Sequence, residues 1–134
     1  MKTALTIAGS DSGAGAGIQA DLKTFAAHDV FGLCAITAIT AQNTIGITAV
    51  HSVPADIVVA QLEAVVSDIG VDAAKTGMLL NAATVEAVAT SVESLNIPNL
   101  VVDPVMIAKS GDRLLKDEAI DIMKTELLSR ASVV

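Results

Sequence analysis

The chain has 134 residues, of which 52% are hydrophobic and only two are aromatic, and its net charge at pH 7 is −7. This length predicts one domain with a buried core of mainly Ala, Val, Ile and Leu side chains. The acidic balance argues against nucleic-acid binding, which requires a basic patch, and every apolar run is too short to span a membrane. Cys34 is the single cysteine, so an internal disulfide is excluded and we expect a small buried side chain in a cytoplasmic protein.

The most informative stretch lies near the N-terminus, in residues 7–21, which read IAGSDSGAGAGIQAD. Apolar residues lead into four glycines, and apolar positions then recur at helical spacing, which predicts a strand, a tight turn and a helix. A turn that leads into a helix N-terminus directs free N–H groups outward, toward an anion or a polar ring. Asp21 lies one turn into the helix, where we expect it to face a pocket.

Two common phosphate-binding motifs are incomplete in this stretch. No Lys follows the glycines, as a P-loop requires, and position 18 is Ile where a dinucleotide-binding fingerprint has its third glycine. A tight turn of small residues that packs a strand closely against a helix is therefore an equally good interpretation of the glycines alone.

Strands and helices alternate along the rest of the chain. We predict strands at residues 3–8, 33–41, 71–75, 100–102 and 131–134, and helices at residues 15–28, 54–70, 81–97 and 114–128. Residues 44–51 alternate between apolar and polar side chains, which predicts a further, half-exposed strand outside the main sheet. This order indicates a three-layer α/β/α domain with a mainly parallel sheet, and we expect residues 1–134 to form one such domain.

Apolar residues at helical spacing predict the helix faces that point into the core. They are Ile18, Leu22, Phe25 and Ala26 in the first helix, Val58, Leu62, Val65 and Ile69 in the second, Val85, Val88, Val92 and Leu95 in the third, and Ile120, Met123 and Leu127 in the fourth. Asn81 is the predicted cap of the third helix.

Chemically useful residues recur where the predicted strands end. In an open parallel sheet, ligands bind beyond the carboxyl ends of the strands. Gly9, Gln42, Lys75 and Asp103 all lie at such ends, so we expect one ligand site at this edge of the sheet. The amide of Gln42 carries an acceptor and two donors for the edge of a heterocyclic ring, although a hydrogen bond to its own loop is an alternative.

The same stretches carry a family resemblance. Residues 8–24 (AGSDSGAGAGIQADLKT) closely resemble the N-terminal signature of the hydroxymethylpyrimidine and phosphomethylpyrimidine kinases of thiamine biosynthesis, in the ribokinase-like superfamily. The resemblance continues in the family's order through residues 37–44 (TAITAQNT), 75–78 (KTGM), 102–106 (VDPVM) and 109–111 (KSG). It covers essentially the whole chain and implies the N-terminal half of a ribokinase-like domain, with residues 44–51 as a flap beside the substrate.

The resemblance also implies roles for individual residues. The family's substrate-binding positions match Gly9, Asp21, Gln42, Met78 and Val105, with the carboxylate of Asp21 holding the substrate's hydroxymethyl group or ring and Met78 beneath the pyrimidine. Asp103 matches the acid near magnesium and the phosphates, which makes it the expected metal ligand, and Lys109 matches a loop near the phosphates. Each residue has a structural alternative, such as a core position for Met78 or a loop cap for Asp103.

The resemblance further implies a cytoplasmic homodimer that uses ATP and Mg²⁺ to phosphorylate a small-molecule pyrimidine, 4-amino-5-hydroxymethyl-2-methylpyrimidine, and then its monophosphate. In the family, the anion-hole loop, the catalytic residue beside it and most nucleotide contacts lie in the second half. We therefore expect no catalytic residue within these 134 residues and no ATP turnover by this chain alone. Two alternatives stay open: a pyridoxal or pyridoxine kinase of the same superfamily, and a half-domain that self-associates without catalysis.

Overall fold

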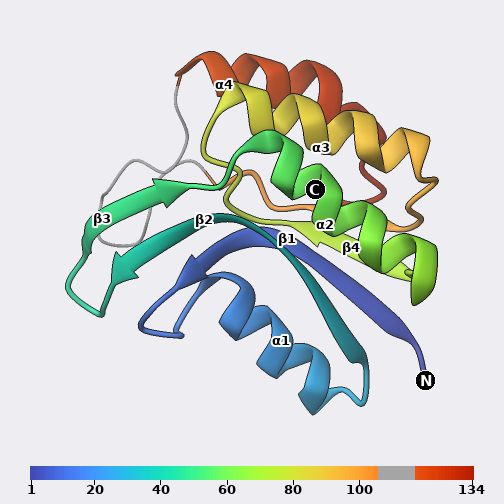
Figure 1. Ribbon diagram of the computed structural model, residues 1–134, viewed down its shortest axis with the longest axis horizontal. Coiled ribbons are helices and arrows are strands. Elements are labelled where there is room, and N and C mark those ends of the chain that lie inside the picture. Colours follow the sequence, from blue (N-terminus) through green and yellow to red (C-terminus); the bar gives the residue numbers. More distant parts are fainter. Residues whose placement is uncertain (106–116) are drawn as a thin grey trace.

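The computed structural model describes residues 1–105 and 117–134. Its strands are β1 (Thr3–Asp11), β2 (Phe31–Gln42), β3 (Ile47–Ser52), β4 (Ala73–Thr76) and β5 (Leu100–Val102), and they form one sheet in the order β3-β2-β1-β4-β5. All neighbouring strands run parallel except β2 and β3, which pair antiparallel. The carboxyl ends of β1, β2, β4 and β5 therefore lie along one edge of the sheet (Figure 1).

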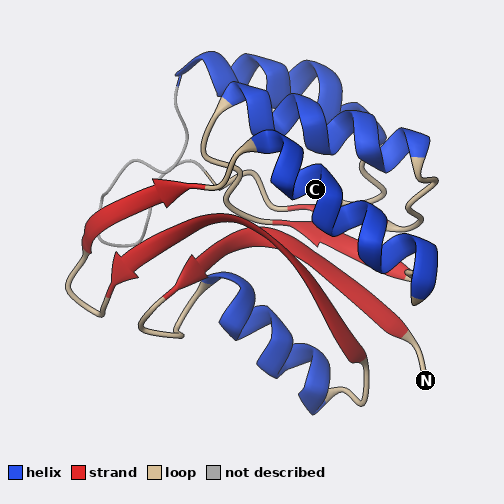
Figure 2. Ribbon diagram, viewed as in Figure 1, coloured by secondary structure: helices blue, strands red, loops and turns tan. Residues whose placement is uncertain are grey.

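Helices cover both faces of this sheet (Figure 2). One face carries α1 (Gly17–Ala27), and the other carries α2 (Ala55–Asp68), α3 (Ala82–Ser94) and α4 (Asp117–Ile122). The predicted three-layer α/β/α architecture with a mainly parallel sheet is therefore confirmed. Among the described residues, no helix combines the length and the apolar character needed to cross a membrane.

Local sequence explains where the helices begin. The Asn81 side chain accepts a hydrogen bond from the N–H of Thr84 at 3.0 Å, which confirms the predicted cap of α3. Pro54 precedes α2, where its missing N–H leaves no hydrogen bond unmade. Gly17 opens α1 with a φ of +61°, and any side chain there would overlap the carbonyl of Gly9. The chain can therefore turn from β1 into α1 only with glycine at this position.

Several predicted strand boundaries were wrong. β1 continues past residue 8 to Asp11 because its pairing with β2 resumes after a bulge between Ala8 and Ser10, and β2 begins at Phe31 because that residue pairs with Thr3 at the start of β1. β4 begins at Ala73 rather than at residue 71. The strand predicted at 44–51 does not lie outside the main sheet: β3 is its antiparallel edge strand. Apolar–polar alternation marks a half-exposed strand but does not reveal its neighbour.

The C-terminal prediction was also wrong in detail. Among the described residues, α4 ends at Ile122 and is followed by a π-helical turn at Met123–Leu127 and a 3₁₀ turn at Leu128–Arg130. The predicted start of this helix at residue 114 falls outside the described residues. The strand predicted at 131–134 is reduced to a single parallel bridge between Val101 and Val133.

The main core lies between the sheet and the layer of α2, α3 and α4. Its largest fully buried side chains are Leu5, Ile7, Val58, Leu62, Leu79, Val85, Val88, Leu100, Val102, Met123 and Leu127. Most residues predicted to face inward are buried or partly buried, but Ile69 and Ala26 are exposed, because each lies at the end of its helix.

Cys34 is half-buried in β2, and burial raises the pKa of its thiol, which suits a packing residue better than a nucleophile.

Candidate functional site

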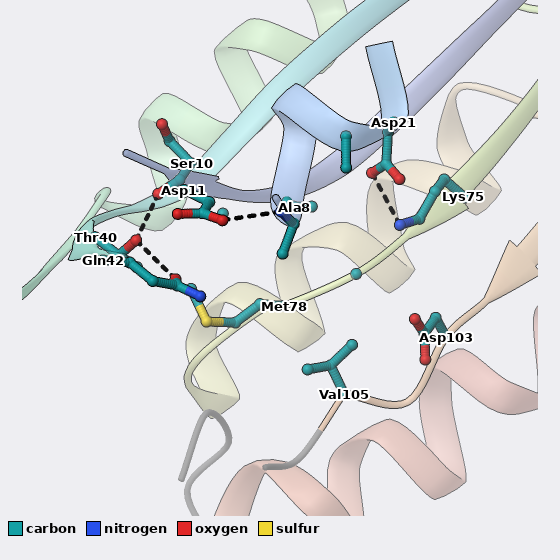
Figure 3. A pocket seen from close by; sticks show the side chains of 15 residues that line it. Ala8, Ser10, Asp11, Asp21, Thr40, Gln42, Lys75, Met78, Asp103 and Val105 are labelled. Atoms are coloured by element: carbon teal, nitrogen blue, oxygen red, sulfur yellow. Dashed lines mark hydrogen bonds and ion pairs between the residues drawn. The ribbon is translucent and has the colours of Figure 1, made fainter. Parts of the chain in front are cut away.

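A cleft of about 270 Å³ opens where β1, β2, β4 and β5 end, beside the first turns of α1 (Figure 3). Its volume is close to the lower end of the range for small-molecule sites, roughly 300–1,000 Å³. Six residues predicted for the site line this one cleft: Gly9, Asp21, Gln42, Met78, Asp103 and Val105. Lys109, the seventh, lies outside the described residues. All the predicted site residues that the structure describes therefore lie together at the carboxyl edge of the sheet, as expected.

The glycine-rich turn is folded around the carboxylate of Asp11. Oδ1 accepts a hydrogen bond from the N–H of Gly13 at 2.7 Å, and Oδ2 accepts from Gly15 and Ala16 at 3.1 and 2.9 Å. Asp11 itself is buried. The expectation that this turn directs free N–H groups toward a ligand is wrong for these three, because an internal carboxylate takes them. The carboxylate fixes the shape of the cleft wall instead.

Asp21 belongs to a polar cluster on the α1 side of the sheet. Its Oδ2 accepts hydrogen bonds from the Thr6 hydroxyl at 2.6 Å and from the Lys75 ammonium at 2.9 Å. The side chains of Lys75 and Asp21 are only 24% and 19% exposed, so water weakens this ion pair less than it would a surface pair. Oδ1 of Asp21 has no partner among the described residues. The carboxylate is thus held at one oxygen, and the other remains available to a ligand in the cleft.

Gln42 is the last residue of β2 and lies at the far end of the cleft from Asp21 (Figure 3). Its side-chain amide lies 3.1 Å from the hydroxyl of Thr40, which in turn donates to the carbonyl of Ser10 at 2.8 Å. Gln19 of α1 completes the chain of contacts, since its Nε2 donates to the Ser10 hydroxyl and its Oε1 accepts from the N–H of Asp11. Thr40 therefore holds the amide of Gln42 on the side away from the cleft, and the amide retains hydrogen-bonding capacity toward the cleft.

Met78 forms an apolar part of the cleft because Gly9 has no side chain. A Cβ at Gly9 would lie 2.5 Å from the Met78 Cε, so the methionine occupies the space that a larger residue would fill. Met78 is 9% exposed, and its carbonyl accepts a hydrogen bond from the buried Thr37 hydroxyl. Val105 lines the same cleft (Figure 3). These side chains offer a flat ring an apolar surface between the polar groups.

Asp103 follows β5 on the opposite side of the cleft from Gln42 (Figure 3). Its N–H donates to the Thr76 carbonyl at 3.1 Å, which fixes the backbone, while its carboxylate is exposed and has no partner among the described residues. Within that part of the chain, no group of three or more His, Cys, Asp or Glu side chains could enclose a metal ion. One free carboxylate still fits Mg²⁺, which is often held by one or two carboxylates together with substrate phosphates.

The sequence alone assigned no individual role to three residues that organise the cleft. Asp11 shapes the turn, Thr40 contacts the amide of Gln42, and Lys75 pairs with Asp21. Lys75 was noted only as part of a strand-end motif. A signal for it was present, because alternation in β4 places Lys75 on the face opposite Ala74 and Thr76. The ion pair of Lys75 with Asp21 shows that this is the face that α1 covers.

Comparison with known proteins agrees with this geometry. Residues 11–134 match the model of a family described as phosphomethylpyrimidine kinase. The chain belongs to this family. Over 131 residues it is 52% identical to the hydroxymethylpyrimidine/phosphomethylpyrimidine kinase of Bacillus subtilis (strain 168). The aligned residues cover 98% of this chain and 48% of the Bacillus subtilis protein. The chain spans about half the length of the curated relatives that it matches.

Solved structures of this family and of pyridoxal kinases share the fold. The crystal structure of phosphomethylpyrimidine kinase from Clostridium difficile 630 superimposes with a TM-score of 0.92 at 48% identity, over 98% of this chain and 57% of that one. An ADP complex of Bacillus subtilis pyridoxal kinase gives a TM-score of 0.86 at 41% identity, over 98% of this chain and 50% of that one. The resemblance inferred from the motifs and the ribokinase-like fold are both confirmed.

Proposed function

We propose that this chain forms the substrate-binding half of a kinase that uses ATP to phosphorylate the hydroxymethyl group of 4-amino-5-hydroxymethyl-2-methylpyrimidine, and then its monophosphate. Membership of the phosphomethylpyrimidine kinase family supports the reaction class. The observation that carries the proposal is the cleft itself, which brings Gln42, Asp21 and Met78 together from three separate parts of the chain.

Each of these residues has a task that suits an aminopyrimidine. The amide of Gln42 pairs with the polar edge of the ring, and Met78 and Val105 contact its apolar surface. The unpartnered Oδ1 of Asp21 accepts a hydrogen bond from the hydroxymethyl group, while Lys75 keeps the carboxylate in place. Holding the hydroxyl in one orientation lowers the entropic part of the barrier to phosphoryl transfer.

We place the phosphates and Mg²⁺ at the other side of the cleft. The free carboxylate of Asp103 is the proposed metal ligand, and Lys109 is proposed to lie near the phosphates. Bound there, the metal would neutralise charge that develops on the transferred phosphoryl group. Asp103 is exposed, so its carboxylate can be reached by a hydrated ion that retains most of its waters.

Gln42→Ala in the complete enzyme tests the pyrimidine assignment. We expect the free energy of pyrimidine binding to weaken by about 1–3 kcal/mol, the usual loss when a buried polar partner is removed, with nucleotide binding nearly unchanged. Gln61→Ala is the matched control, because that side chain bonds both backbone groups of Ile36 and does not line the cleft. Equal losses for pyrimidine and nucleotide after Gln42→Ala contradict the assignment.

A pyridoxal kinase is the second candidate, supported by the fold shared with the Bacillus subtilis pyridoxal kinase at 41% identity. The two activities separate in one assay that offers the complete enzyme the hydroxymethylpyrimidine and pyridoxal at equal concentration. A larger kcat/KM for the pyrimidine supports the first proposal, and a larger value for pyridoxal replaces it with the second.

The proposed protein is a cytoplasmic homodimer. β3 is an edge strand whose outer side pairs with no other strand among the described residues, and such edges are usually covered. Exposed Ile39 and Val50 lie nearby on β2 and β3. Light scattering at micromolar concentration measures the mass, and a monomer contradicts this part of the proposal. We expect no ATP turnover by the 134-residue chain alone, and measured turnover would exclude the alternative of a non-catalytic half-domain.

A further inference from the structure

The hydroxyl of Thr40 lies close to two oxygen atoms but has only one proton to donate. Its Oγ1 lies 2.8 Å from the Ser10 carbonyl oxygen and 3.1 Å from the atom assigned as Oε1 of Gln42. Both of these oxygens are acceptors only, and a threonine hydroxyl has one proton to donate. Thr40 is 4% exposed, so no bulk water stands between these groups. The shorter contact, to Ser10, receives the proton.

The contact with Gln42 then requires a donor on the amide side. The oxygen and nitrogen of a Gln amide have nearly the same shape, and their placement follows from their hydrogen bonds. Turned by 180°, the amide places Nε2 beside Thr40, and Nε2–H donates to the free lone pair of Oγ1. Only this orientation makes both short contacts of Thr40 hydrogen bonds. No other group among the described residues bonds to the Gln42 side chain and opposes the turn.

We propose that Thr40 orients the Gln42 amide with its nitrogen toward Oγ1 and its carbonyl oxygen toward the cleft. The cleft then presents an acceptor, which selects a ring with an exocyclic amino group and disfavours a ring with an oxygen acceptor at that place. The inference rests on the proposed function, which puts the ring beside Gln42. Thr40 acts through Gln42 and is therefore a positioning residue.

The surroundings of Thr40 hold this orientation in place. Ser10 is fixed by Gln19, whose Nε2 donates to the Ser10 hydroxyl at 2.6 Å, and Gln19 is itself held by the N–H of Asp11 at 2.8 Å. The Ser10 carbonyl therefore stays within reach of the Thr40 proton. If the amide turned back, two lone pairs would face each other across the Thr40 contact. Buried contacts without a shared proton are strongly disfavoured.

The test compares two ligands that differ at this edge of the ring: 4-amino-5-hydroxymethyl-2-methylpyrimidine and its 4-oxo analogue, in which a carbonyl replaces the amino donor and the neighbouring ring nitrogen carries a proton. Calorimetry on the complete enzyme gives the ratio of the two dissociation constants for the unsubstituted protein, Thr40→Val and Thr40→Ser. We expect the amino preference to fall about tenfold in Thr40→Val, which keeps the shape but loses the hydroxyl. Thr40→Ser keeps the hydroxyl and is expected to retain the preference. An unchanged ratio in folded Thr40→Val, or an equal loss in Thr40→Ser, overturns the inference.

A second readout does not depend on any variant folding. In the ligand-free protein, one Nε2–H proton of Gln42 is expected to exchange slowly with solvent by NMR, since it is bonded to the buried Oγ1. Fast exchange of both protons overturns the orientation. If the unsubstituted enzyme binds neither pyrimidine, the proposed function fails and this inference fails with it. Binding without a Thr40 effect removes the inference alone.

Discussion

The two faces of the sheet are built for different purposes. Toward α2, α3 and α4, the strands present aliphatic side chains such as Leu5 and Ile7, which are fully buried. Toward α1, the same strand β1 presents the hydroxyl of Thr6, which bonds to Asp21. In α1 itself, Ile18 is the only buried residue. One face therefore supplies most of the hydrophobic stabilisation, and the other holds polar groups at fixed positions.

This difference shows where a ligand can be accommodated without loss of the fold. Buried polar groups on the α1 side are mostly paired with each other, but the cleft leaves hydrogen-bonding capacity on Asp21, Gln42 and Asp103. The apolar face has one unpaired buried hydroxyl among the described residues, that of Thr76. Substitutions on the two faces should therefore separate effects on stability from effects on binding.

Leu62→Ala should give the largest loss of stability. Leu62 of α2 is fully buried in the main core, and truncating such a side chain usually lowers the free energy of unfolding by about 3 kcal/mol. The control is Leu22→Ala in α1, which is only partly buried and should lose about 1 kcal/mol. Urea denaturation followed by circular dichroism measures both. Equal losses would mean that the two faces contribute alike.

Lys75→Met should have the next largest effect, and it acts on the polar face. The substitution leaves the Asp21 carboxylate without the ammonium at 2.9 Å, and the lost charged hydrogen bond is expected to lower stability by about 2 kcal/mol. Pyrimidine affinity should fall as well, because Asp21 is no longer held in place. Lys75→Arg keeps the positive charge and should recover most of both losses. A Lys75→Met variant with unchanged affinity would separate the ion pair from the ligand site.

Gly9→Ala should affect binding more than stability. The new methyl group would lie 2.5 Å from the Met78 Cε, and the flexible methionine can move aside, so the expected loss of stability is about 1 kcal/mol. Its movement takes away the apolar surface of the cleft, and pyrimidine affinity should fall by about tenfold or more. Gly15→Ala is the control, since the nearest atom to a Cβ at that position would be Asp11 Oδ2, at 3.9 Å. Comparable losses in both variants would argue against a special role for the space at Gly9.

Much of the fold could be predicted because it depends on local patterns. The glycine-rich turn, the cap at Asn81 and the alternation of strands and helices are readable from neighbouring residues. The edge where the site lies also follows, because parallel strands end on the same side. The place of β3 could not be predicted, since its partner β2 is determined by pairing in space and not by its own alternation.

The inner organisation of the site depends on register between distant segments. Thr6 of β1 is the register partner of Lys75 in β4, and this pairing brings the lysine to Asp21 across 54 positions of sequence. Asp11 was missed for a different reason. Its carboxylate binds N–H groups of its own turn, and a sequence pattern does not distinguish a turn closed on itself from a turn open to a ligand.

The smallest expected effect lies at the opposite end of the sheet from the cleft, at Asp72. A hydrogen bond from the backbone N–H of Thr3, at 2.8 Å, lowers the pKa of Asp72 below its ordinary value of 3.8, with a smaller contribution from nearby Lys2. Because the folded protein holds the carboxylate in its charged form, this contribution to stability is present above pH 3.8. It is lost as the pH falls through the lower pKa of the folded state.

Asp72→Asn keeps the shape and one acceptor but removes the charge. Its melting temperature should therefore lie slightly below that of the unsubstituted protein at pH 7, and the gap should close as the pH is lowered below about 4. Thr3→Val is the control, because it removes the hydroxyl that also contacts Asp72 but leaves the backbone N–H in place. It should retain most of the pH dependence. Thermal melts from pH 3 to pH 7 measure the gap, and a gap that stays constant over this range would show that the charge of Asp72 does not stabilise this end of the sheet.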